Sequence, residues 1–154
     1  MQRRRLIWGF ALAGLTVLGA SGCDDTEYET WVANLDGAQE NPGTGSTAAG
    51  RAVLLVAKDE SRVDITVTLT SPLQGELRLA HIHRAPQGTN GGVIHNLWVP
   101  NVTTTPPFDV GAPLARTFTF TAENFNDLRA GNYYVNVHSS RNPGGEIRGQ
   151  LVRQ

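Results

Sequence analysis

Alternating apolar and polar residues are the main pattern of the chain after residue 27. Between residues 62 and 69, Val63, Ile65 and Val67 occupy every second position, with polar residues between them. Successive side chains of a β-strand point to opposite faces, so a period of two predicts a strand with one buried face. The same pattern predicts strands at residues 28–35, 51–58, 62–69, 77–83, 92–99, 115–121, 132–138 and 146–152.

Only residues 122–129 have the character of a helix, with Thr121 as a possible N-cap and Gly131 just beyond the end. Many short strands joined by polar loops are typical of two packed antiparallel sheets. The pattern therefore predicts an all-β antiparallel sandwich of seven or eight strands with at most one short helix. The positions expected to be buried are Val53, Leu55, Val63, Ile65, Val67, Phe118, Phe120, Tyr133, Val135 and Val137.

The first residues have the features of an export signal. Three arginines, Arg3 to Arg5, precede an apolar run at residues 6–18, which is shorter than the roughly 18–20 residues that span a bilayer. The run leads to the single cysteine, and Ser21-Gly22-Cys23 resembles a bacterial lipobox, although Ala20 stands where leucine is usual. We expect a lipoprotein signal peptide at 1–22, lipidation of Cys23, and an acidic tether at 23–29. The alternative is an ordinary signal peptide that leaves a free thiol.

Removal of residues 1–22 would leave 132 residues, which suits one domain, here expected at 30–154. Ten basic side chains would then face fourteen acidic ones, so a nucleic-acid partner is not expected. A single cysteine allows no internal disulfide bond. The expected location is the cell envelope, exported and held to the membrane by lipid.

Histidines are the candidate functional residues. His81 and His83 lie two apart in a predicted strand, so their side chains share one face. His138 lies on the face of a later strand that also carries Tyr134 and Asn136. Two histidines of one strand and a third of another form a common site for copper or zinc. Surface or hydrogen-bonded histidines that fix loops are the alternative.

Two motifs make a family resemblance recognisable. The stretch LAHIHRAPQGTNGGVIHNL, followed by GNYYVNVHSSRNPGGEIRGQL, strongly resembles the CHRD domain, named after chordin. The opening stretch that contains Gly37, Glu40 and Pro42 is also similar to that family. The resemblance covers most of residues 30–153 and implies an extracytoplasmic β-sandwich, without implying an agreed activity.

A weaker similarity connects the chain to copper/zinc superoxide dismutase, an eight-stranded Greek-key sandwich. By motif, His81 and His83 correspond to the copper-binding pair and His138 to the late copper ligand, while His95 lies where a bridging histidine could stand. The chain lacks the zinc-binding histidine and aspartate cluster, the disulfide bond and the long charged loop of that enzyme. Arg148 or Arg141 could steer anions toward a copper ion. These departures argue against dismutase activity.

No Gly-x-Ser-x-Gly motif and no pair of catalytic carboxylates stands out, so no catalytic residue is predicted. Glu146 and Arg148 either pair across strands and cap loops, or support the imidazole ligands from behind, Glu146 through His138. Two functions remain open: an envelope protein that binds a metal ion, copper before others, through His81, His83, His138 and possibly His95, and a metal-free module that binds an envelope or extracellular partner. Metal affinity is expected to weaken as the pH falls through about 6.5, the ordinary pKa of histidine.

Overall fold

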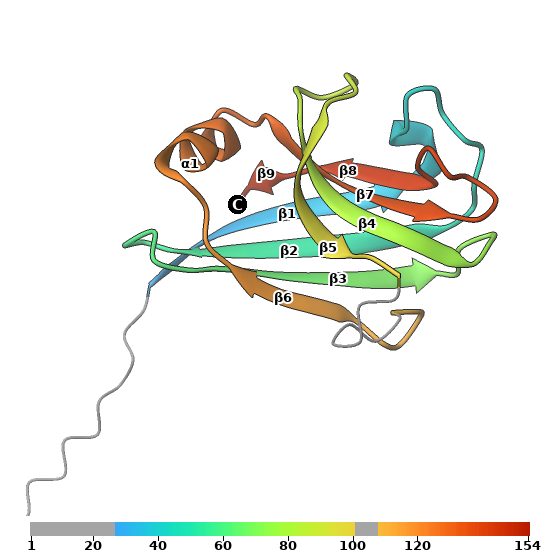
Figure 1. The fold of residues 1–154 in the computed structure, drawn as a ribbon, viewed down its shortest axis with the longest axis horizontal. Helices are drawn as coiled ribbons and strands as arrows, with labels where there is room; N and C mark the ends of the chain where they lie inside the picture. Colours follow the sequence, from blue (N-terminus) through green and yellow to red (C-terminus); the bar gives the residue numbers. More distant parts are fainter. Residues whose placement is uncertain (1–26, 101–107) are drawn as a thin grey trace, which may run out of the picture.

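The computed structural model of the protein describes residues 27–100 and 108–154 (Figure 1). The expected signal peptide, Cys23 and the tether up to residue 26 lie outside these residues. Within them, no helix has the length and apolar character needed to cross a membrane. The elements in chain order are β1 (Tyr28–Asp36), the 3-10 helix η1 (Gly37–Gln39), β2 (Ala49–Ala57), β3 (Val63–Ser71), β4 (Leu77–Arg84), β5 (Gly92–Trp98), β6 (Leu114–Phe118), α1 (Ala122–Arg129), β7 (Tyr133–Ser139), β8 (Ile147–Gln150) and β9 (Val152–Arg153).

The strands follow one hydrogen-bonded path, β5-β4-β7-β8-β1-β2-β3-β6, with β9 added beside β1. Strands β8 and β1 are paired at a single position, Asp36 with Arg148, so the sheet bends there into two layers (Figure 1). The links from β3 to β4, β5 to β6 and β6 to β7 each cross between the layers, which gives Greek-key connections. The predicted all-β antiparallel sandwich with one short helix is confirmed. The predicted last strand is divided into β8 and β9.

A single hydrophobic core fills the space between the layers. It joins Trp31, Leu54 and Ile65 of one layer to Ile82 and Val135 of the other. Six of the ten predicted core residues are buried, and these are Val63, Ile65, Val67, Tyr133, Val135 and Val137. The other four, Val53, Leu55, Phe118 and Phe120, are only half-buried.

Strand β2 explains the error at Val53 and Leu55. Residues 52–57 are apolar at every position, so a period of two cannot show which face is buried. In the structure, Ala52, Leu54 and Val56 point into the core. The expected strand is therefore present with its inward and outward faces exchanged.

The last two residues of the expected tether, Tyr28 and Glu29, belong to β1, which begins at Tyr28. Tyr28 and Glu29 pair with Ala57 and Val56 of β2. The Glu29 carboxylate also forms an ion pair with Arg153, in which Glu29 Oε1 lies 2.5 Å from an Arg153 guanidinium nitrogen. Backbone pairing therefore incorporates these two residues into the domain.

Helix α1 has the predicted cap. The Thr121 hydroxyl accepts a hydrogen bond from the Asn124 amide, and the Asn124 side-chain oxygen accepts one from the Thr121 amide. The helix buries Phe125 and Leu128 against the core and is followed by Gly131, whose φ of 76° is unfavourable for other residues. These features close the end of the sandwich from which β7 begins.

Candidate metal centre

Strand pairing brings three histidines together on the outer face of the β4–β7 pair. His81 and His83 point away from the core, opposite to the buried Ile82 between them. Strand β7 runs beside β4, with His81 opposite Asn136 and His83 opposite Tyr134. His138, opposite Leu79, lies on the same face. The predicted grouping of His81, His83 and His138 is therefore present.

The three imidazole rings converge. The ring centres of His81 and His138 are 4.9 Å apart, and those of His81 and His83 are 5.4 Å apart. His81 Nδ1 lies 3.2 Å from His138 Nε2, and one nitrogen of each ring lies within 4.8 Å of the other two. Bonds of about 2.0–2.1 Å to one ion hold neighbouring nitrogens roughly 3.3–3.5 Å apart. The spacing therefore fits a metal ion after a small inward movement of the most distant ring.

Backbone carbonyl groups orient two of the rings. His83 Nδ1 contacts the Gly91 carbonyl at 3.0 Å, and His138 Nδ1 contacts the Pro143 carbonyl at 2.9 Å. A carbonyl can only accept, so both Nδ1 atoms carry the proton and both Nε2 atoms carry the lone pair, which at His138 faces His81 Nδ1. His83 Nε2 is buried and has no hydrogen-bond partner. A buried lone pair without a donor is suited to bind a metal ion.

The Gly91 carbonyl reaches His83 because residue 91 has no side chain. A Cβ at this position would lie 1.9 Å from the Arg84 carbonyl oxygen. The Gly91 amide also donates to the Tyr134 hydroxyl at 3.2 Å. The loop after β4 is thus held against β7 by the same residue that orients His83.

Burial keeps the three imidazoles neutral. It lowers the pKa of His81 to about 4, with smaller effects in the same direction from His138 and His83. Burial also lowers the pKa of His83 and of His138, although the carbonyl hydrogen bonds oppose this change. The lone pairs are therefore available at neutral pH and below it. We therefore expect metal affinity to begin to fall at a pH lower than 6.5.

His95 does not join the other three histidines. It is paired with Ile82, so it lies on the inner face of β5, opposite to the face that carries His81 and His83. Its ring stacks on Phe118 of β6, with ring centres 3.8 Å apart. The expectation of a fourth imidazole ligand at His95 is not met by this arrangement.

Arg148 lies behind the histidine cluster. Its guanidinium carbon is 3.6 Å from the centre of the Tyr134 ring, and Tyr134 stacks on His83 with an interplanar angle of 4°. The side chain is 2% exposed and donates to Asn90 Oδ1 at 2.9 Å and to the Thr89 carbonyl at 2.6 Å. Arg148 therefore contacts the His83 side of the cluster through Tyr134.

Glu146 does not support an imidazole directly, because His138 Nδ1 bonds to Pro143 instead. Its fully buried carboxylate accepts from Ser46 Oγ at 2.8 Å and from the Gln74 amide at 2.7 Å. Burial raises the pKa of Glu146, but hydrogen bonds, the strongest from Ser139, outweigh this effect and lower it. Glu146 thus has the other role considered for it, which is to cap loops.

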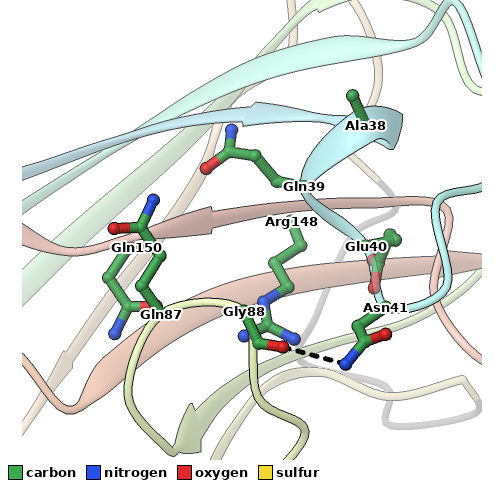
Figure 2. Close-up of a pocket in the computed structure, with 8 residues that line it drawn as sticks. All are labelled: Ala38, Gln39, Glu40, Asn41, Gln87, Gly88, Arg148 and Gln150. Carbon is green, nitrogen blue, oxygen red and sulfur yellow. Dashed lines mark hydrogen bonds between the residues drawn. The ribbon is translucent and has the colours of Figure 1, made fainter.

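A polar pocket of about 350 Å³ lies beside Arg148 (Figure 2). It is lined by Ala38, Gln39, Glu40, Asn41, Gln87, Gly88, Arg148 and Gln150. Asn41 donates to the Gly88 carbonyl at 2.8 Å, which joins the two loops that border the pocket. Burial raises the pKa of Glu40 to about 7. The charge of Arg148 and a hydrogen bond from Asn136 oppose this rise but are outweighed by it.

Asn136 connects this pocket to the histidines. Its side chain donates to Glu40 Oε1 at 2.5 Å and lies beside His81 in the sheet, on the face that carries His138. Gly145 permits this contact, because a Cβ there would lie 2.4 Å from Asn136 Nδ2 and 2.6 Å from Glu40 Oε1. Sequence reasoning assigned no role to Glu40, Tyr134 or Asn136. The period of two had placed Tyr134 and Asn136 on the His138 face, and that was the available signal.

Comparison with known proteins agrees with the resemblance seen in the motifs. Neither the curated proteins nor the solved structures include a match to the chain. The family model described as CHRD domain matches residues 31–151, a range that contains the three converging histidines, Glu40 and Arg148. The chain belongs to the CHRD domain family.

Proposed function

We propose that this protein is a lipid-anchored protein of the cell envelope that binds one copper ion through His81, His83 and His138. The observation that carries the proposal is the convergence of three neutral imidazoles, with His83 Nε2 buried and unpartnered. The two backbone hydrogen bonds at Nδ1 support it, because histidine ligands of metals commonly donate their second ring N–H to such a group.

Copper is favoured by the chemistry of the donors. The group contains imidazole nitrogen alone, and imidazole suits copper, zinc, iron and nickel. Among divalent first-row metals, copper has the highest affinity for such a site. Three protein ligands leave a position open for exchange.

The test is titration of metal-stripped protein with Cu(I) and Cu(II) in competition with a chelator of known affinity. Replacing His81 or His138 with Ala is expected to weaken binding by about a hundredfold, since one of three ligands is lost. His95→Ala is the matched control and should retain the wild-type affinity, because His95 lies on the other face of the sheet. Wild-type binding weaker than micromolar in both oxidation states, or a triple His→Ala variant that binds equally well, would refute the proposal.

The anchor rests on the sequence before the domain. The charged start, the short apolar run and the lone Cys23 support lipidation. Two or more acyl chains hold a protein stably on a membrane, whereas one chain binds weakly. We expect the mature chain to begin at an acylated Cys23 and to sediment with membranes, and Cys23→Ala to abolish both. Mass spectrometry of the mature N-terminus decides this, and an unmodified Cys23 inside a longer mature peptide would contradict it.

A metal-free binding module is the second candidate. It is favoured by the contact between His81 Nδ1 and His138 Nε2, which is a direct hydrogen bond without any ion. The polar pocket beside Glu40 and Arg148 would then be the surface that contacts a partner. Failure of the metal titration would leave this candidate.

A further inference from the structure

We propose that the histidine site selects singly charged copper, Cu(I), over divalent ions, and that Arg148 sets this preference. The inference rests on the proposed function, since it concerns the ion held by His81, His83 and His138. Arg148 acts as a positioning and electrostatic residue and would not contact the ion.

The ligand set contributes no negative charge. The grouped ligands are three neutral imidazoles, and no carboxylate of the described residues belongs to the group. His81 and His138 are buried, so an ion among them loses much of its contact with water. The cost of burying an ion rises steeply with its charge, so a site of this kind accepts a single charge more readily than a double charge.

Arg148 adds a permanent positive charge close to the site. Arginine stays protonated in proteins, and this guanidinium is almost fully buried. Its stacking on Tyr134 at 3.6 Å and the stacking of Tyr134 on His83 at 4.8 Å together place the charge within about 8.4 Å of the His83 ring centre. Repulsion by this charge is twice as large for a divalent ion as for Cu(I).

Glu40 provides the opposite charge at the same pocket. Its carboxyl group bonds to Asn136, the residue beside His81 in the sheet. Removal of Glu40 should therefore strengthen the preference for Cu(I), whereas removal of Arg148 should weaken it. Opposite signs at two neighbouring residues distinguish an electrostatic effect from general damage to the site.

The experiment compares the affinities of wild type, Arg148→Gln, Arg148→Lys and Glu40→Gln for Cu(I), Cu(II) and Zn(II) at pH 8. With an effective dielectric constant near 20, Arg148→Gln should raise affinity about tenfold more for the divalent ions than for Cu(I). The Cu(II)/Cu(I) potential should then fall by about 59 mV, the equivalent of a tenfold change for one electron. Arg148→Lys should change the ratio of divalent-ion affinity to Cu(I) affinity less, because it keeps the charge. Glu40→Gln should change this ratio in the opposite direction.

The exposed Arg51 of β2 supplies the control, since Arg51→Gln removes an equal charge that contacts none of the histidines. A structural defect in Arg148→Gln would weaken the binding of all three ions equally. The ratio of their affinities would then stay unchanged. An unchanged ratio in that variant, or tighter binding of Cu(II) than of Cu(I) by wild type, would overturn this inference alone. Absence of all metal binding by wild type would overturn the proposed function and this inference with it.

Discussion

Metal-free Glu40→Gln protein is expected to lose about 3 kcal/mol of unfolding free energy through His81 alone as the pH falls from 6.5 to 4. The pKa of His81 in the folded protein is lowered to about 4 by burial, whereas in the unfolded chain it has the ordinary value near 6.5. Between these values the unfolded chain binds a proton that the folded protein does not bind. Stability therefore falls as the pH falls, by 1.36 kcal/mol for each pKa unit of difference.

Glu40 is removed in this experiment because it titrates with the opposite effect. Its pKa in the folded protein is raised to about 7 by burial. Below pH 7 the folded protein therefore binds a proton that the unfolded chain does not bind until about pH 4.5. This proton stabilises the folded protein as the pH falls, so wild type should show a shallower dependence than Glu40→Gln.

Denaturant unfolding at a series of pH values measures the effect, with a chelator present to exclude metal. The control is the double variant Glu40→Gln, His81→Gln, which lacks the imidazole. It should be less sensitive to pH by about 3 kcal/mol over the same interval. Parallel curves for the single and double variants would show that His81 titrates normally in the folded protein.

Period-two alternation was sufficient to predict most strands and the shared face of His81 and His83. It could not show that β7 would pair with β4, because His138 is more than fifty residues further along the chain. Strand order depends on packing of the whole sandwich, and here the grouping of the three histidines was suggested by the similarity to copper/zinc superoxide dismutase. The pattern therefore predicted which face of its strand carries each of these histidines, and the pairing of β7 with β4 brings those faces together.

His95 shows the limit of spacing as evidence. Its strand was predicted correctly, but its face depends on the register between β5 and β4, which shifts between Ala80 and His81 and again between Ile82 and His83. Each one-residue shift reverses the face on which a side chain lies relative to its neighbours. Such irregularities have no signature in residues 92–98, so sequence reasoning could not exclude His95 from the cluster.

Glu40 was missed for a different reason. It follows η1, in a segment whose backbone has no periodic pattern. Its contact with Asn136 joins residues 96 positions apart and depends on the absence of a side chain at Gly145. The family resemblance included Glu40 but gave it no role, and only the folded structure shows that it borders the same site as Arg148.

Glu146→Ala is expected to lower the unfolding free energy by about 3–5 kcal/mol. The substitution leaves two part-buried donors without their acceptor, the Gln74 amide and the Ser46 hydroxyl, and it empties the space of a fully buried side chain. Glu146→Gln keeps the volume and one acceptor oxygen, so its cost should be smaller. Glu76→Ala is the matched control, because that carboxylate is exposed and forms an ion pair with the exposed Arg78; its cost should stay below about 0.5 kcal/mol.

Copper affinity gives a second measure of what Glu146 contributes. Its carboxylate lies close to Ser139 and Asn142, which belong to the turn whose Pro143 carbonyl contacts His138 Nδ1. Loosening this turn should weaken metal binding, even though Glu146 itself would not touch the ion. Denaturant unfolding gives the stability change, and the copper titration, carried out well below the unfolding midpoint, gives the change in affinity. If Glu146→Ala lies within 1 kcal/mol of wild type, the loops do not depend on this carboxylate. If stability falls but copper affinity is unchanged, the His138 ring is held in place by β7 and Pro143 without help from Glu146.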